Sequence, residues 1–230
     1  MRKVLALLLV LLMGASCAAA DSEGSVTQYS CSIVQSGEYY LVYCFAQIHN
    51  DSNSVICLER GSFDLHSGEQ LLATEEVSQL WPYFLAPGED GYVFDIVSFE
   101  PGENGAVVPQ VTAISYTIEY MTVGEQTVSR DLSCVSRVEE DVYGGTVVIC
   151  ELTNNTDDVA YDPTVAFGLY TDEGAMIYAD GVTLKDVGIP AGGTTLVRFR
   201  IDEVFVKQWE GYGVKPAEAR VNASFGTDDD

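Results

Sequence analysis

The chain is poor in basic residues and histidine, and beyond its N-terminus it lacks long apolar runs. Its 230 residues include 11 lysines and arginines against 35 acidic side chains, and only two histidines, His49 and His66. Because such an excess of negative charge repels phosphate backbones, nucleic acid is excluded as a partner. No apolar run after the first twenty residues is long enough to span a bilayer as a helix.

Common catalytic motifs are missing as well. The sequence contains no Gly-x-Ser-x-Gly elbow, no His-Glu-x-x-His helix and no glycine-rich phosphate loop. An enzyme needs a nucleophile, a base and an electrophilic group that converge on one point. We therefore expect a protein without catalysis, cofactor or metal. The alternative is an envelope enzyme with a site around His49, His66 and nearby carboxylates.

Residues 1–20 form an export segment, with Arg2 and Lys3 before an unbroken apolar run and small residues after it. The Met-Gly-Ala-Ser-Cys sequence that ends at Cys17 resembles the lipobox of bacterial lipoproteins. In that interpretation Cys17 carries a lipid and anchors the protein to the cell membrane. The alternative is an ordinary signal peptide cut after residues 18–20. Both interpretations predict an extracytoplasmic protein. Removal of the export segment leaves 9 basic and 35 acidic groups, a net charge of −26.

Two stretches of the chain, about a hundred residues apart, show the same order of features. In residues 146–177 an apolar run ends in the Asn- and Asp-rich turn 154–158, and a second run follows with Phe-Gly-Leu at 167–169. In residues 40–72 the turn lies at 50–53, and the second run contains Phe-Asp-Leu. The match predicts an internal repeat.

Short strand-like runs separated by turn residues fill both copies of the repeat. They lie at 26–33, 39–48, 55–65, 71–77, 92–97 and 111–120, and then at 132–138, 146–153, 159–170, 175–179, 196–201 and 217–225. Residues 114–120 alternate apolar and polar side chains, as a half-buried strand does. After the export segment, apolar residues nowhere recur at helical spacing over three turns, and the closest case, 204–209, is short.

These runs predict an all-β chain: two tandem antiparallel immunoglobulin-like β-sandwiches after an N-terminal signal peptide. The first sandwich is expected at 25–122 and the second at 127–226. The physical reason is that isolated hairpins are marginal in water, whereas two facing sheets bury each other's apolar faces.

Residues 167–174, Phe-Gly-Leu-Tyr-Thr-Asp-Glu-Gly, resemble the signature of FxLYD-type domains in bacterial cell-surface lipoproteins. The resemblance covers nearly all of 126–226 and, more weakly, 26–122. The second copy inserts Thr171 before the aspartate, and the first has His66 where the tyrosine is expected. The resemblance implies a β-sandwich fold and an extracellular setting, and it carries over no catalytic residue.

Five cysteines remain once the lipobox cysteine is lipidated or removed. In an oxidising compartment we expect two disulfides, Cys31–Cys44 and Cys134–Cys150, each joining the first strand of a repeat to the next. Each short loop closed in this way contributes about 3 kcal/mol of stability. Cys57 is left over and is expected to pack as a small apolar side chain, with a reactive or intermolecular thiol as the alternative.

The candidate ligand-binding residues are Trp81, Tyr83 and Phe84, which flank a proline and have no aromatic counterpart in the second repeat. Exposed rings at such a turn stack on sugars or anchor a protein partner. The alternative, which we favour, is that Trp81 and Phe84 cap the first sandwich or fill the contact between the two sandwiches.

The turns at 50–53 and 154–158 gather oxygen ligands of the kind that calcium prefers. Asn, Asp and Ser are equally what tight turns require, and neither run has the spacing of a calcium loop, so we favour turns. Taken together, the sequence predicts a non-catalytic binding or spacer module of the bacterial cell envelope. Its partners are the cell membrane, through the lipid on Cys17, and an unknown protein or glycan.

Overall fold

The structure is a computed structural model of the chain. It describes residues 7–9, 24–77, 79–100, 110–124, 128–129 and 132–226. Most of these residues lie in β-strands, and every pair of strands is antiparallel, which confirms the all-β class at this level. No helix in the described ranges is long and apolar enough to cross a membrane.

The strands before residue 124 form two sheets. They are β1 (Leu7–Leu9), β2 (Ser25–Ser36), β3 (Tyr39–His49), β4 (Val55–Ser67), β5 (Gln70–Val77), β6 (Phe84–Leu85), β7 (Asp90–Phe99) and β8 (Ala113–Val123). One sheet has the order β1-β2-β3-β7. The other has the order β5-β4-β6, and β8 also pairs with β4.

The strands after residue 127 form three more sheets. They are β9 (Val128–Ser129), β10 (Leu132–Glu140), β11 (Thr146–Asn154), β12 (Ala160–Tyr161), β13 (Thr164–Tyr170), β14 (Met176–Thr183), β15 (Gly188–Ile189), β16 (Thr194–Arg200) and β17 (Glu218–Gly226). Their orders are β10-β11-β16, β14-β13-β17-β9 and the short pair β12-β15.

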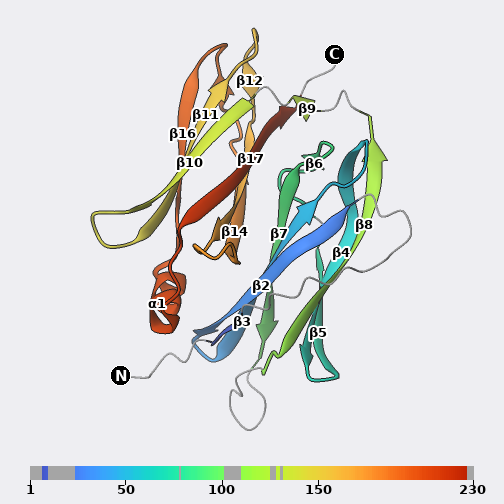
Figure 1. Cartoon of the computed structure of the whole chain (residues 1–230), viewed down its shortest axis with the longest axis vertical. Helices are drawn as coiled ribbons and strands as arrows, with labels where there is room; N and C mark the ends of the chain where they lie inside the picture. The colour runs from blue at the N-terminus through green and yellow to red at the C-terminus, as the bar shows by residue number, and fades with distance from the viewer. Residues whose placement is uncertain are drawn as a thin grey trace.

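The larger sheets follow one another in space, from β8 and β4 on the right of Figure 1 to β10 and β16 on the left. Phe63 of β4 shares a buried cluster with Val42 of β3 and Val93 of β7. Phe45 and Tyr92, on the opposite face of β3 and β7, belong instead to the cluster that surrounds the second half of the chain. The sheet of β2, β3 and β7 is therefore covered on both faces.

We call the contact between this covered sheet and the second half the seam. Its residues are Tyr43, Phe45, Gln47, Trp81, Tyr92 and Phe94 on one side, and Gly168, Tyr170, Tyr178, Gly181, Phe205 and Arg220 on the other. The predicted boundary near residues 123–126 lies partly outside the described residues.

The alternation predicted for the closing strand of the first repeat is confirmed in β8. Ile114 is buried against β4, whereas Ser115, Thr117 and Glu119 on the other face are exposed. One face of β8 therefore completes the core, and the other face lies at the surface.

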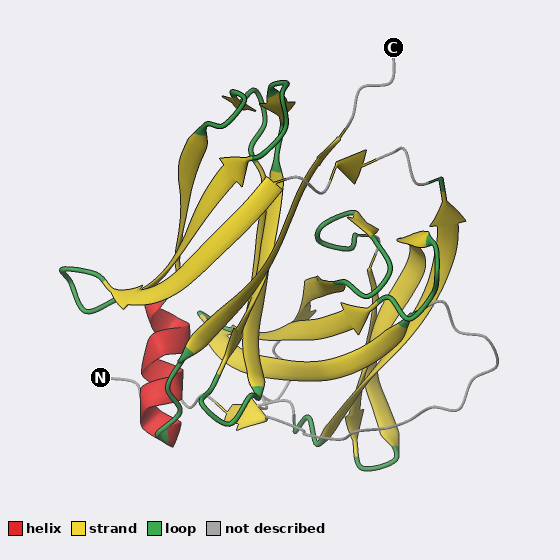
Figure 2. Ribbon diagram, turned by 45° about the horizontal axis from the view of Figure 1, so that its top comes forward, coloured by secondary structure: helices red, strands yellow, loops and turns green. Residues whose placement is uncertain are grey.

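The expectation of no helix is wrong at α1 (Glu203–Tyr212), drawn in red in Figure 2. The Asp202 side chain caps its N-terminus, accepting a hydrogen bond of 2.9 Å from a first-turn backbone N–H, and Gly213 ends it with φ 68°. Phe205 and Trp209, one turn apart, are buried. A ten-residue helix has room for little more on its buried face, so no periodicity over three turns develops.

The run expected at 159–170 is also not one strand, because β12 and β13 are separated at Asp162 and Pro163. Proline lacks the N–H that a strand ladder needs. Asp162 has φ 47°, in the left-handed region that a strand cannot contain. The chain therefore leaves one sheet and enters another at this point.

Candidate functional site

Buried polar groups in the seam find their partners across it. The Tyr170 hydroxyl donates to Gln47 Oε1 at 2.9 Å, and the Tyr92 hydroxyl donates to the Arg220 carbonyl at 2.9 Å. Burial raises the pKa of Tyr92 to about 12 and raises the pKa of Tyr170 further, so both phenols stay neutral donors. The Arg220 guanidinium lies 4.1 Å from the centre of the Tyr170 ring. Separating the halves would leave the Tyr92 and Tyr170 hydroxyls without these hydrogen-bond partners.

The three candidate ligand-binding rings divide into Trp81 on one side and the pair Tyr83 and Phe84 on the other, whose ring centres lie 4.7 Å apart. Trp81 stacks on Phe94 with ring centres 6.0 Å apart, and its ring covers Gly181 of β14, where an added Cβ would lie 3.0 Å from it. Phe84 is half-buried in β6 and pairs in register with a residue of β4. Tyr83 is 47% exposed. Trp81 is therefore part of the seam, as the alternative that we favoured requires.

Replacing Trp81 with alanine should lower the free energy of unfolding by about 2–3 kcal/mol, because the ring leaves a gap between β7 and β14. Thermal unfolding of Trp81→Ala measures this loss, and Tyr83→Ala is the control, with an expected change below about 1 kcal/mol. An unchanged melting temperature for Trp81→Ala would return Trp81 to the candidate binding residues.

The two histidines of the alternative enzyme site are not brought together. His49 ends β3, where its Nδ1 lies 2.8 Å from Asp90 Oδ1. His66 lies near the far end of β4, about 35 Å of strand from the turn that follows His49. The structure therefore gives no support to a shared site around these residues.

The two Asn-rich turns have the same hydrogen bonds. Asn154 Nδ2 donates to the carbonyls of Asp158 at 2.7 Å and Ile189 at 2.8 Å, and Asn154 Oδ1 accepts from the Thr156 N–H and hydroxyl. Asn50 repeats this pattern with the corresponding residues, Ser54, Leu85 and Ser52. Both asparagines are fully buried. Their side-chain oxygens already accept hydrogen bonds within the turn, which favours the turn interpretation over calcium.

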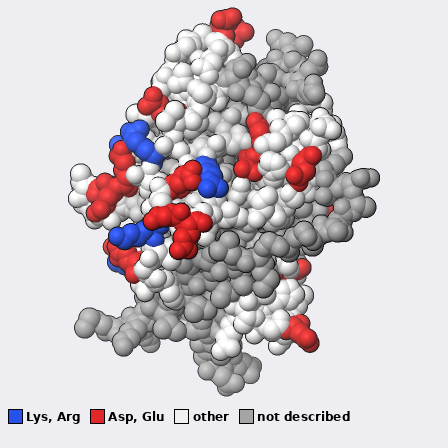
Figure 3. Space-filling model, viewed as in Figure 1, with Lys and Arg blue, Asp and Glu red and all other residues white. Residues whose placement is uncertain are grey.

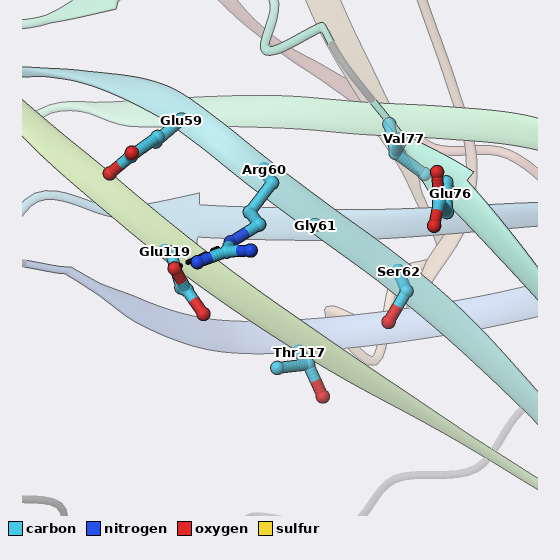
Figure 4. A pocket seen from close by; sticks show the side chains of 8 residues that line it. All are labelled: Glu59, Arg60, Gly61, Ser62, Glu76, Val77, Thr117 and Glu119. Atoms are coloured by element: carbon cyan, nitrogen blue, oxygen red, sulfur yellow. Dashed lines mark hydrogen bonds and ion pairs between the residues drawn. The ribbon is translucent and has the colours of Figure 1, made fainter.

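A groove that the sequence did not predict opens on the outward face of the β4 sheet (Figure 4). Its volume is about 620 Å³, and it is lined by Glu59, Arg60, Gly61, Ser62, Glu76, Val77, Thr117 and Glu119. It lies at a β-bulge, because Leu58 pairs with Tyr120 and Arg60 pairs with Glu119, which leaves Glu59 as the extra residue.

Arg60 is the most distinctive residue of the groove, since it is the only lysine or arginine between residues 25 and 122. Its Nε lies 2.6 Å from Glu119 Oε2, and both side chains are at least half exposed. Such an exposed pair adds little stability, so both groups can exchange partners at small cost. The groove offers donors, carboxylates and hydroxyls to a polar ligand. The signal in the sequence was the adjacent pair Glu59-Arg60, which interrupts the apolar strand run.

Five cysteines lie in described residues, and all are free thiols in the structure. Cys31 lies directly opposite Cys44 across β2 and β3, and Cys134 and Cys150 are hydrogen-bonded to each other across β10 and β11. The structure thus brings both expected pairs together without showing either bond, and the two disulfides stay predictions. Cys57 is 1% exposed, within the core. Cys17 lies outside the described residues.

Asp180 of β14 is a half-buried carboxylate. Burial raises its pKa, and hydrogen bonds from the Tyr178 hydroxyl at 3.2 Å and the Gly181 N–H at 2.8 Å offset part of that rise. The folded protein therefore holds the Asp180 proton to a higher pH than the unfolded chain does.

This shift predicts the effect of Asp180→Asn on stability. Because the folded pKa is raised above an unfolded value of about 3.9, the stability present below that pH is lost as the pH rises through the folded value. The variant lacks this loss, so its free energy of unfolding should increase relative to that of the wild type between pH 4 and pH 7. Urea unfolding at several pH values measures the difference. A difference that does not change with pH would contradict the prediction.

No protein-family model matches the chain, and no curated protein matches it significantly. The likeness of residues 167–174 to FxLYD-type domains therefore stays a prediction from those residues.

Proposed function

We propose that the chain is a non-catalytic binding or spacer module of the bacterial cell envelope. It consists of two tandem immunoglobulin-like β-sandwiches of the FxLYD type and is held at the membrane by a lipid on Cys17. The tandem arrangement is supported by the turns of Asn50 and Asn154, whose hydrogen bonds are the same partner by partner.

The seam is the observation that carries the spacer role. Two modules joined only by a linker would move independently, whereas here Gln47, Tyr92 and Tyr170 are buried and bonded across the contact. A chain held in this way keeps a fixed separation between its anchor and whatever it presents.

The groove around Arg60 is the surface that best suits a bound protein or glycan. It faces outward, away from the seam, and most of its lining is polar: Glu59, Arg60, Ser62, Glu76, Thr117 and Glu119. On the face drawn in Figure 3, the described lysine and arginine side chains lie beside acidic ones. Arg60 is the only lysine or arginine between residues 25 and 122, and the groove around it is lined by Glu59, Glu76 and Glu119, which suits a ligand that carries both hydroxyl and charged groups.

Metabolic labelling tests the proposed anchor. The full chain is expressed in a bacterium supplied with an alkyne fatty acid, and label and location are compared between the wild type and Cys17→Ser. We expect the wild type to be labelled and to sediment with membranes, and Cys17→Ser to lose the label. Ser16→Ala, which keeps a small residue before the cysteine, is the control and should stay labelled. An unlabelled wild type would contradict the anchor.

The non-catalytic assignment has a separate test. Purified protein is assayed with ester, peptide and glycoside substrates, and no turnover above the uncatalysed rate is expected. Turnover that Arg60→Ala or Glu119→Gln abolishes would make the groove an active site and contradict the proposal.

A further inference from the structure

The two thiol pairs have different surroundings. Cys31 and Cys44 lie directly opposite each other in β2 and β3, and neither has any exposed surface. Cys134 pairs in register with Leu152, two residues from Cys150, so the second pair is diagonal. Cys150 is buried, but Cys134 is only half-buried and lies in β10, an edge strand of its sheet. Only the second pair is within reach of a reagent in solution.

The thiols also differ in acidity. Burial raises the pKa of Cys31 to about 12, and it raises those of Cys44 and Cys57 as well. In the second pair the hydrogen bond from Cys134 lowers the pKa of Cys150. The same hydrogen bond raises the pKa of Cys134, so the two thiols share a proton and Cys150 is the thiolate of the pair. Since the thiolate is the nucleophile, the second pair ionises more readily than the other thiols.

We propose that Cys134 and Cys150 form a thiol–disulfide exchange site, which a small disulfide or an oxidised thiol oxidoreductase converts reversibly into a disulfide. Cys134 passes its proton to the Cys150 thiolate and attacks one sulfur of the oxidant, whose sulfur–sulfur bond breaks and releases a thiolate. That thiolate takes the proton from Cys150. The Cys150 thiolate then attacks the Cys134 sulfur and releases the second thiolate. The two leaving thiolates take up the two protons that the cysteines lose. The protein loses two electrons and the oxidant gains them.

Closing this bond requires the two sulfurs to move from hydrogen-bond distance to about 2.05 Å. The edge position of β10 makes such a shift feasible, because among the described strands β10 pairs only with β11. The bond would tie β10 to β11 and restrict the unfolded chain, so the oxidised protein should melt at a higher temperature than the reduced one. The proposal does not depend on the lipid anchor.

Disulfide mapping of the folded protein tests the proposal. The full chain carrying Cys17→Ser is reduced, freed of reductant and incubated with glutathione disulfide at pH 7.5 without denaturant. It is then alkylated and digested with trypsin. Cuts after Arg130, Arg137 and Lys185 put Cys134 and Cys150 on separate peptides, whereas Cys31, Cys44 and Cys57 share the peptide that ends at Arg60.

The expected result is a disulfide between peptides 131–137 and 138–185, formed at least about tenfold faster than any change at the three buried cysteines. Cys150→Ser should trap a mixed disulfide of Cys134 with glutathione, and Cys134→Ser should leave Cys150 a free thiol. The proposal is overturned if Cys134 and Cys150 both stay alkylated thiols. It is equally overturned if Cys31 and Cys44 oxidise at the same rate, or if the Cys134 mixed disulfide persists in the presence of Cys150.

Discussion

Replacing Gly168 with alanine should lower the free energy of unfolding by about 2–3 kcal/mol, because β13 has no space for a methyl group at the seam. A Cβ at this position would lie 2.5 Å from Tyr92 Cε1 and 2.9 Å from the Tyr170 ring. The backbone cannot retreat easily, since Gly168 pairs with Ala179 on one side and Arg220 on the other. Thermal or urea unfolding of Gly168→Ala measures the loss.

Gly211→Ala is the matched control for this change. Gly211 lies in α1, and a Cβ there would meet no atom within 4 Å. Alanine should stabilise the helix at this position by about 0.5–1 kcal/mol. If Gly168→Ala also proves neutral or stabilising, the two halves are not packed as the seam requires. At the matching position of the first repeat, Asp64 accepts a hydrogen bond from the Thr74 hydroxyl on the exposed face of the sheet, whereas Gly168 lies in the seam.

Asn154→Ala is expected to cost about 2–4 kcal/mol, since the side chain is fully buried and its loss leaves the Asp158 and Ile189 carbonyls and the Thr156 N–H without these partners. Chemical denaturation should show the loss. Asn155→Ala, one residue further on at an exposed position, should stay within about 0.5 kcal/mol of the wild type.

The alternative interpretation, that the same turn binds calcium, predicts a different result. If the turn were a calcium loop, added calcium would raise the melting temperature and a chelator would lower it. We expect neither change, because the Asn154 side-chain oxygen is already bonded to the Thr156 N–H and hydroxyl. A calcium-dependent rise that Asn154→Ala abolishes would overturn the turn interpretation.

Period-two alternation and turn residues were sufficient to predict the longer strands, apart from the break in the run 159–170 at Asp162 and Pro163. Ile114 and Ser115 lie on opposite faces of β8 as expected, and the Asn50 and Asn154 turns lie at matching places. Such features are local, because side-chain direction in a strand and the chemistry of a tight turn depend on neighbours in the sequence. The short helix α1 was missed, although Asp202 and Gly213 mark its ends, because two buried rings are too few to show a period.

The seam and the groove could not be predicted in the same way, because each depends on how distant segments meet. Gly168 in Phe-Gly-Leu looked interchangeable with Asp64 in Phe-Asp-Leu, and only the seam shows that one faces an aromatic ring and the other lies at the surface. The sequence likewise left open whether Trp81 is exposed, since an aromatic residue beside a proline suits a binding surface and a packed contact equally. The groove depends on the β-bulge at Glu59, and that bulge can be recognised only from the pairing register of β4 with β8.

The measurement that tests this account most directly is differential scanning calorimetry of the full chain. If the seam joins the two halves into one unit, they unfold in a single transition whose calorimetric and van't Hoff enthalpies agree, and Gly168→Ala moves that whole transition to lower temperature. Two separate transitions in the wild type, or a Gly168→Ala variant in which only one part melts earlier, would show that the halves are independent and would contradict the account.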